Sequence, residues 1–255
     1  MRQTLNLFGG VLLVLILWWA GALILDVRVL PTPWVVFGRL GALLAADLLR
    51  HAGASLARVL AGLSVAVATA LPIGVLMGRV PAVDLLLRPI AYLLYPVPKI
   101  ALLPVVLLVV GIGNGAKIVL LVLVLFFQVL TAVRDAARAV DRRYVTTLRS
   151  LGGTPRQVLR YVVWPVVLPR MLTALRVGSA TALAVLFFAE TFFTRYGLGY
   201  FIVDQWSKVA YVEMFAGIVA LGILGVLLFV AIDALERRLC RWTADRRVGN
   251  RNSRG

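Results

Sequence analysis

Residues 141–169 read DRRYVTTLRSLGGTPRQVLRYVVWPVVLP, and this stretch differs from the rest of the chain. It is long and rich in arginine, whereas the segments on both sides of it are almost entirely apolar. A charged segment between apolar ones is the part of a chain that a water-soluble partner can reach. We therefore expect this stretch to meet such a partner.

The first half of the stretch predicts a short amphipathic helix. Asp141 is a suitable N-cap, because its carboxylate can accept a hydrogen bond from a free backbone N–H of the first turn. Apolar residues then recur on one face at helical spacing, and arginines point elsewhere. The apolar residues are Tyr144, Val145, Leu148 and Leu151, and the arginines are Arg142, Arg143 and Arg149.

A tight turn and a second helix follow directly. Gly152 and Gly153 suit the left-handed conformation in which many helices end. Residues 154–157 (TPRQ) match a capping box with proline at the first helical position. Pro165 removes a backbone donor and is expected to break or kink the second helix. The stretch is therefore predicted to be helix, glycine turn, helix and a return to apolar sequence.

The composition indicates an integral membrane protein. The chain has 255 residues, of which 62% are hydrophobic and 15% are charged, and its mean hydropathy is +0.96. Soluble domains average roughly 25% charged residues. The net charge of +16 lies in loops and in the tail, where basic residues set the orientation of a membrane protein, so no nucleic-acid partner is expected. The lone cysteine, Cys240, excludes an intramolecular disulfide.

Six apolar segments are long enough to cross a bilayer, which takes about 20 residues each. The predicted spans are residues 5–25, 55–77, 85–110, 118–133 or 118–137, 166–189 and 212–235, with a polar connector at 191–210. Prolines interrupt the third span, and a broken helix at membrane depth is expected where its backbone is buried or lines a cavity. The third span is therefore the first candidate for lining a pathway.

Arginine and lysine are more numerous on the side that holds the opening stretch and the tail, which predicts that both termini are cytoplasmic. We expect an N-terminal transmembrane helix (1–29), a periplasmic connector with an amphipathic helix (30–54), a transmembrane core (55–240) that includes a cytoplasmic loop (138–165), and a basic tail (241–255). Cleavage of the first span as a signal peptide is the alternative, although apolar sequence continues beyond the candidate cleavage site.

Few residues of this chain have the type and spacing that indicate catalysis or the binding of a cofactor. It contains no G-x-x-x-x-G-K-[ST] nucleotide-binding loop and no zinc-ligand spacing, so we expect no catalysis and no cofactor in this chain. Glu190 ends a span, and either a pathway role or a local ion pair, for example with Arg195, is open. Lys99 stands beside two prolines and is either an interfacial residue or a cation that attracts an anionic solute. The lone histidine, His51, is expected to be interfacial.

The opening stretch resembles the cytoplasmic signature loop of the inner-membrane permease subunits of binding-protein-dependent ATP-binding cassette importers. In that loop a Glu-Ala-Ala triplet is followed at fixed spacing by a glycine, an aliphatic residue and Leu-Pro. The corresponding residues here are Thr146-Thr147-Leu148, Gly152, Val162 and Trp164-Pro165. The triplet itself is absent, whereas the glycine and the downstream prolines Pro165 and Pro169 are in register.

Three flanking segments resemble the nitrate, taurine and aliphatic sulfonate branch of that family. They are LPTP at 30–33, PVPKIALLPVVLLVVGIGNGAK at 96–117 and AETFFTRYGLGYFI at 189–202. The resemblance covers residues 30–240. It implies an all-α type I importer permease in the bacterial inner membrane, which moves a small anion or a related nutrient inward by alternating access.

The resemblance also implies partners. They are a second copy of this chain, two cytoplasmic ATPase subunits that hold ATP and Mg²⁺, an external solute-binding protein and the bilayer. The short helix would dock its apolar face in a groove on the ATPase subunit, with an arginine replacing the contact of the missing glutamate. A basic helix lying on anionic lipid is the alternative. The expected coupling residues are Arg142, Arg143, Tyr144, Val145, Leu148, Arg149, Leu151, Gly152 and Gly153.

The pathway is expected at the interface between two copies of the chain, along the broken third span and parts of the second, fourth and fifth. The candidate lining residues are Pro96, Pro98, Lys99, Gln128, Thr131, Ser179, Phe187 and Glu190. One rival function is a secondary transporter driven by an ion gradient, but the sequence lacks paired acids in mid-membrane and internal repeats. The other is an ATP-driven permease for a different solute or for export.

Overall fold

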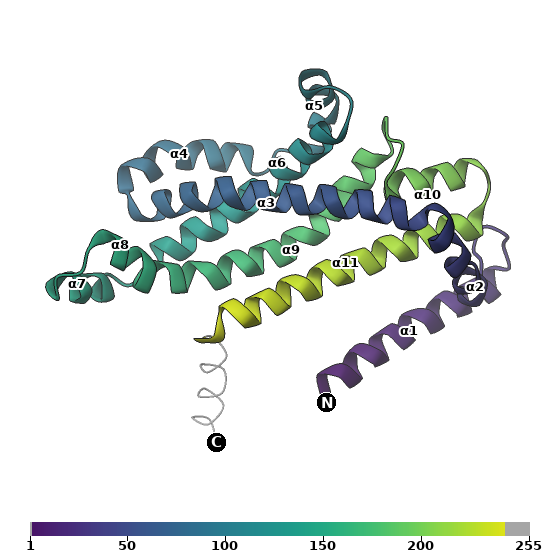
Figure 1. Ribbon diagram of the computed structural model, residues 1–255, viewed down its shortest axis with the longest axis horizontal. Helices are drawn as coiled ribbons and strands as arrows, with labels where there is room; N and C mark the ends of the chain where they lie inside the picture. Colours follow the sequence, from purple (N-terminus) through teal and green to yellow (C-terminus); the bar gives the residue numbers. More distant parts are fainter. Residues whose placement is uncertain (1, 243–255) are drawn as a thin grey trace. The chain divides into compact units, whose positions relative to one another are not determined.

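The computed structural model describes residues 2–242, and all regular structure in this part of the chain is helical (Figure 1). The α-helices are α1 (Arg2–Leu25), α2 (Pro33–Leu43), α3 (Leu49–Arg79), α4 (Pro81–Leu94), α5 (Leu103–Val110), α6 (Asn114–Arg138), α7 (Arg142–Ser150), α8 (Pro155–Val158), α9 (Trp164–Glu190), α10 (Leu198–Ser207) and α11 (Tyr211–Leu239). Leu44–Leu48 and Leu159–Val163 are π-helical turns, and Lys99–Leu102 is a 3₁₀ helix.

Several of these helices could cross a membrane. Pro33–Arg79, Asn114–Arg138, Pro155–Glu190 and Tyr211–Leu239 are long and apolar enough to do so. Helix α4 and the segment Lys99–Val110 form a further candidate, which is bent by 85°. The all-helical membrane fold and the break in the third apolar segment are therefore confirmed, whereas that this segment crosses the membrane as one span stays a prediction. The count of six spans is not established in the described residues, and the side on which the termini lie stays a prediction.

Two predicted boundaries lie within longer helical stretches. Pro165, expected to break or kink the second helix, does not break it, because a π-helical turn before it leads into α9 and Pro155–Glu190 is one apolar helical stretch. Likewise, the amphipathic helix predicted in the connector continues through Leu44–Leu48 into α3. The predicted polar connector at 191–210 contains α10, which is apolar on its buried side.

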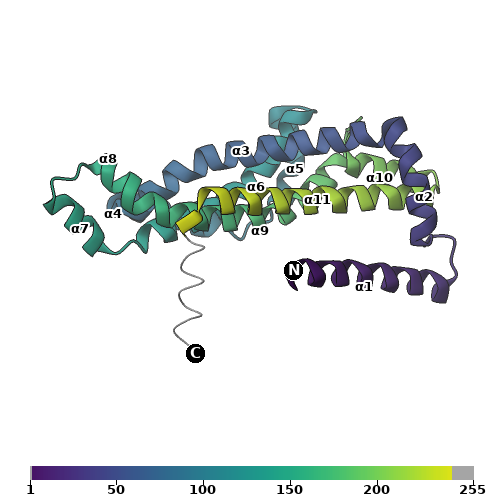
Figure 2. The same cartoon turned by 60° about the horizontal axis from the view of Figure 1, so that its bottom comes forward.

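The chain divides into two compact units, and each is built from two segments. In the described part, the first unit comprises residues 2–56 and 190–224, and the second comprises residues 57–189 and 225–242. The predicted boundaries do not coincide with this division, since α3, α9 and α11 each contribute to both units. Figures 1 and 2 both show α7 and α8 together at one end of the second unit.

In the second unit, α3 packs against α6 through glycines. A Cβ atom added to Gly74 would lie 2.8 Å from Cγ1 of Val133, and one added to Gly78 would lie 2.6 Å from Cβ of Ala137. Such distances leave no room for a side chain, so the two backbones approach closely, as small residues allow in membrane helices. Val133 and Ala137 belong to the main buried cluster of this unit.

In the first unit, a buried polar cluster fastens the segment before α10 to the start of α3. The hydroxyl of Ser55 lies 2.8 and 2.9 Å from the two carboxylate oxygens of Glu190, and it accepts the backbone N–H of Leu198 at 2.9 Å. The N–H of Gly199 also donates to Glu190, at 2.9 Å. A Cβ on Gly197 would collide with the same carboxylate, so only glycine fits there.

His51 extends this cluster. Its Nδ1 lies 3.0 Å from the backbone N of Gly197, and its Nε2 lies 3.0 Å from a carboxylate oxygen of Asp47. Its Nδ1 also lies 3.0 Å from the carbonyl oxygen of Gly197. Both His51 and Glu190 are buried. The segment 190–199 covers both side chains, whereas the interfacial position expected for His51 and the pathway role considered for Glu190 stay predictions.

The glycine contact between α3 and α6 leads to a first prediction. Gly78→Leu should lower the stability of the detergent-solubilised protein by about 1–3 kcal/mol, because the added side chain must push the two helices apart. Thermal unfolding followed by size-exclusion chromatography measures this. Gly222→Leu in α11 is the matched control, since a Cβ there meets no atom within 4 Å. Equal losses for both variants would contradict the packing argument.

The cluster around Glu190 leads to a second prediction. Ser55→Ala should destabilise the first unit by about 1–3 kcal/mol, because it leaves a buried carboxylate and a buried backbone N–H each short of a partner. Hydrogen exchange at the amides of Leu198 and Gly199 should accelerate accordingly. Ser207→Ala removes a hydroxyl that bonds only the exposed carbonyl of Asp204 and serves as the control. Unchanged protection at both amides would refute this role of Ser55.

Candidate functional site

The broken third span owes its geometry to two prolines and one lysine. The carbonyl of Leu94 cannot be bonded by the N–H four residues later, because that residue is Pro98, and it accepts the N–H of Val97 at 3.3 Å instead. The ammonium of Lys99 donates to the carbonyls of Leu94 at 2.6 Å and Tyr95 at 2.5 Å, and it lies 4.9 Å from the ring centroid of Phe127. Lys99 therefore caps the end of α4 at the bend.

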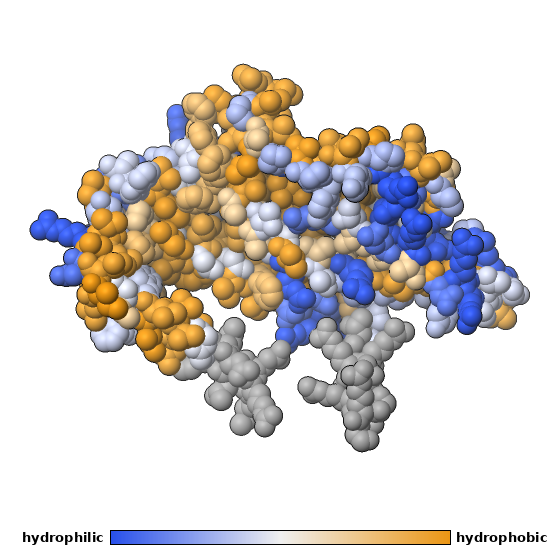
Figure 3. All heavy atoms as spheres, turned by 180° about the vertical axis from the view of Figure 1, so that it is seen from behind, coloured by the Kyte–Doolittle hydropathy of each residue, from blue (hydrophilic) through white to orange (hydrophobic). Residues whose placement is uncertain are grey.

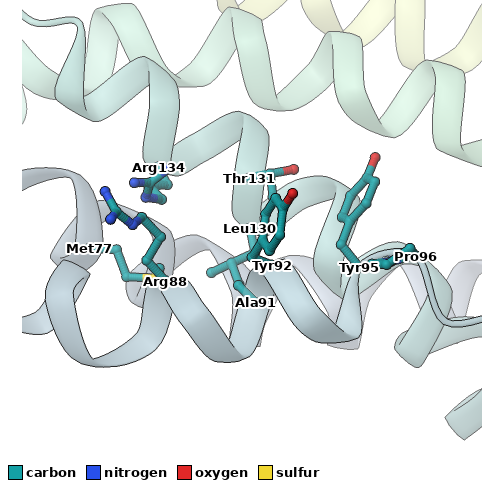
Figure 4. Close-up of a pocket in the computed structure, with 9 residues that line it drawn as sticks. All are labelled: Met77, Arg88, Ala91, Tyr92, Tyr95, Pro96, Leu130, Thr131 and Arg134. Atoms are coloured by element: carbon teal, nitrogen blue, oxygen red, sulfur yellow. The ribbon is translucent and has the colours of Figure 1, made fainter.

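A cavity of about 510 Å³ lies between α4 and the helices α3 and α6 of the second unit (Figure 4). One end carries two guanidinium groups, and the other carries the phenol rings of α4 (Figure 4). The wall between them is apolar. The lining residues are Met77, Arg88, Ala91, Tyr92, Tyr95, Pro96, Leu130, Thr131 and Arg134.

The two arginines of this cavity differ in their electrostatic environment. Arg134 forms a two-pronged pair with the carboxylate of Asp84, through its Nε and through Nη2 at 2.9 Å, and Arg138 also reaches Asp84 at 3.3 Å. Arg88 makes no hydrogen bond or ion pair with any described residue. The guanidinium of Arg88 interacts with Asp84 only at longer range, so on the cavity wall its hydrogen-bond donors are not taken by a described residue.

A second cavity of about 360 Å³ lies on the other side of Tyr95, between the bend of the third span and helices α6 and α9. Lys99, Phe127, Gln128 and Thr181 are among its lining residues. The side-chain oxygen of Gln128 is buried and accepts no hydrogen bond. A buried acceptor without a donor is uncommon in folded proteins and marks a place where a ligand or water can bind.

The structure brings several predicted pathway residues together. Pro96 and Thr131 line the first cavity, and Pro98, Lys99 and Gln128 line the second. Three others lie elsewhere. Ser179 is buried and donates to the carbonyl of Arg176 at 2.7 Å, Phe187 is half-buried on α9, and Glu190 belongs to the cluster of the first unit. The role of each in a pathway stays a prediction.

Sequence reasoning missed Arg88, Asp84 and Arg134. The signal that was available is the spacing of Asp84 and Arg88, which are four residues apart on a helix and would be expected to pair with each other. Asp84 pairs instead with Arg134 on α6, fifty residues later in the chain. Only the packing of α4 on α6 reveals that Arg88 does not form the close ion pair with Asp84 that their spacing predicts.

The local structure of the signature loop follows its sequence. Asp141 caps α7 by accepting the N–H of Arg143 at 2.8 Å, and Gly152 has φ +81°, in the left-handed region. Thr154 and Gln157 form both hydrogen bonds of the capping box. The predicted helix, glycine turn and second helix are confirmed.

The apolar face of α7 is divided, which corrects the expectation that all of it is open to a partner. Val145 is only 7% exposed and, with Leu148, packs into the core of its own unit. Tyr144 and Leu151 are 66% and 79% exposed. Figure 3 shows hydrophilic side chains gathered at the α7 end of the second unit. The surface open to a partner consists of Tyr144 and Leu151 together with the exposed arginines Arg142, Arg143 and Arg149.

Comparison with known proteins agrees with this architecture. Residues 70–243 match the family of binding-protein-dependent transport system inner membrane components. The taurine transport system permease TauC of Escherichia coli is 33% identical over 94% of this chain and 90% of its own. The putative aliphatic sulfonates transport permease SsuC of Bacillus subtilis is 31% identical over 86% of this chain and 80% of its own.

A solved structure shows the same fold. The inward-facing methionine ABC transporter MetNI contains a chain that superposes with a TM-score of 0.65 at 25% identity, covering 76% of this chain and 97% of that one. Neither an ion-gradient-driven transporter nor an exporter is supported by these relatives. The family match spans more than half of the sequence and includes both cavities and the signature loop. This chain therefore belongs to the binding-protein-dependent inner membrane components, the permeases of ATP-binding cassette importers for small solutes.

Proposed function

We propose that this permease imports a small organic anion, and that a short aliphatic sulfonate such as taurine is the solute. The observation that carries this proposal is the guanidinium of Arg88 on the wall of the 510 Å³ cavity, which forms no hydrogen bond and no close ion pair with a described residue. An arginine offers a planar set of donors that matches a tetrahedral or planar oxyanion. The printed names of two relatives, for taurine and for aliphatic sulfonates, support the same class.

The remaining wall of the cavity suits the rest of such a solute. Met77, Ala91 and Leu130 offer apolar contacts for a short carbon chain. The hydroxyl groups of Tyr92 and Tyr95 lie toward the far end of the cavity (Figure 4). They can bond a polar group at the opposite end of the solute. An anionic head near Arg88 and a small polar tail near the phenols describe an aminoalkyl sulfonate.

The proposed energy source is ATP, bound with Mg²⁺ on two partner ATPase subunits, with α7 as the element that contacts them. A second copy of this chain and an external solute-binding protein complete the complex. Tyr144 and Leu151 are large, exposed apolar side chains beside three exposed arginines. Apolar anchors surrounded by charge are typical of a docking helix in a groove. Because Val145 packs into the core of its own unit, a displacement of α7 would be transmitted to the membrane helices.

The solute site leads to a third prediction. Arg88→Gln should lower taurine import into proteoliposomes by at least about tenfold, because a hydrogen bond to a charged group contributes about 1.5–3 kcal/mol. The assay uses the permease with its ATPase subunits and binding protein. Arg170→Gln, which changes an exposed arginine of α9, should have no effect. If the wild-type complex transports neither taurine nor ethanesulfonate, the proposed solute class is wrong.

The coupling helix leads to a fourth prediction. Replacing Tyr144 and Leu151 together by serine should weaken association with the ATPase subunits by at least tenfold, because burying one such side chain contributes about 1.5–3 kcal/mol. Co-purification at graded ATPase concentrations measures the affinity. Ile112→Ser changes an equally exposed apolar residue in the α5–α6 loop and is the control. Full retention of the ATPase subunits by the double variant would contradict docking through α7.

A further inference from the structure

The start of α9 contains a backbone carbonyl that its own helix cannot satisfy. In an α-helix the carbonyl of Pro165 accepts from the N–H of residue 169, but residue 169 is also proline and carries no hydrogen on its nitrogen. A carbonyl that lacks its helical donor must be satisfied by water or by another group of the protein. Pro165 stands directly after the loop formed by α7 and α8.

The missing donor comes from the other end of the same unit. The indole Nε1–H of Trp242, three residues after the end of α11, donates to the carbonyl of Pro165 at 3.1 Å. Indole nitrogen can only donate, and the Pro165 carbonyl can only accept. The two groups therefore complement each other, and the bond links residues 77 positions apart in the sequence.

Neighbouring contacts hold α11 along α9 up to this bond. Arg176 of α9 pairs with Asp233 of α11 at 2.9 Å and with Glu236 at 3.6 Å. Cys240 is 1% exposed and belongs to the same buried cluster as Val163, which lies at the base of the α7–α8 loop. The end of α11 is thus packed against the point where the loop rejoins the membrane helices.

We infer that Trp242 is a positioning residue. Its indole supplies the hydrogen-bond donor that Pro169 lacks, and so holds the end of α11 at the base of the α7–α8 loop. This hydrogen bond connects the α7–α8 loop and the start of α9 to the end of α11, so that the three segments move together. A displacement of α7 is then passed to two membrane helices rather than one. This consequence for transport rests on the proposed function, whereas the fastening itself does not.

Cys240 provides a built-in reporter of the fastening, because it is the sole cysteine of the chain and is buried beside Trp242. Burial raises the pKa of its thiol, so its reaction with a maleimide is slow while the end of α11 stays packed. Trp242→Phe keeps an aromatic ring but has no N–H. In the purified permease this variant should be labelled about 3- to 10-fold faster than wild type, the range expected for one lost hydrogen bond.

Trp206→Phe is the matched control, because Trp206 is exposed and its indole makes no hydrogen bond with described residues. It should be labelled at the wild-type rate. Labelling of Trp242→Phe at the wild-type rate overturns the inference.

A double-variant cycle tests the role of the proline. Pro169→Ala restores a backbone N–H that can satisfy the Pro165 carbonyl within α9. In that background, Trp242→Phe should change the labelling rate by less than about twofold. If Pro169→Ala does not accumulate, Trp242→His, which keeps a ring N–H, should be labelled more slowly than Trp242→Phe. Equal effects of Trp242→Phe in both proline backgrounds overturn the claim that the indole replaces the missing donor.

The positioning role is tested in the complex with the ATPase subunits. Trp242→Phe should reduce the stimulation of ATP hydrolysis by the solute-loaded binding protein at least twofold, with an unchanged melting temperature. A residue that only stabilised the fold would lower the melting temperature and leave the ratio intact. Fast labelling with normal stimulation overturns the positioning role alone, whereas failure of the wild-type permease to bind ATPase subunits counts against the proposed function instead.

Discussion

The rest of this structure depends on one constraint: a backbone carbonyl or N–H in an apolar environment must find a hydrogen-bond partner within the protein. Helices meet this constraint everywhere except at their ends and at prolines. Among the described residues, two carbonyls that face a proline four residues later accept a hydrogen bond from a side chain. The ammonium of Lys99 donates to the carbonyl of Leu94, which also accepts the N–H of Val97, and the indole of Trp242 donates to the carbonyl of Pro165. These carbonyls lie at the bend beside the cavities and at the base of the signature loop.

The same constraint explains how the chain holds its buried charges. The carboxylate of Glu190 receives a hydroxyl and a backbone N–H, and that of Asp84 receives two guanidinium groups. Isolated ions are costly at low dielectric, so compensated ones are the rule. Arg88 differs from both carboxylates, because it is exposed on a cavity wall and forms no close ion pair with a described residue. Its place on the wall of a cavity, beside apolar side chains, distinguishes it from the other exposed arginines of the loops.

Whether a feature could be predicted from the sequence depends on how far apart in the chain the residues that cause it lie. The N-cap at Asp141, the turn at Gly152 and the broken third span were predicted correctly, because their causes lie within a few residues. The burial of Glu190, the inward packing of Val145 and the lack of a close ion pair at Arg88 could not be predicted. Each depends on which distant helix lies alongside, as when Asp84 pairs with Arg134 rather than with its neighbour on α4. The two compact units likewise join segments that lie far apart in the chain.

The divided face of α7 bears on what its partner must look like. Val145 and Leu148 are used to anchor the helix to its own unit, which leaves only Tyr144 and Leu151 as apolar contacts for another protein. Two such side chains bury a small area, so charge has to contribute to the specificity of docking. Arg142, Arg143 and Arg149 are exposed, and their side chains form no ion pair with described residues. The family triplet begins with a glutamate, whereas this chain presents only positive charge at that helix. A complementary groove would therefore be apolar at its centre and acidic at its rim, and an ATPase subunit selected by a glutamate-bearing permease would be a poor partner for this one.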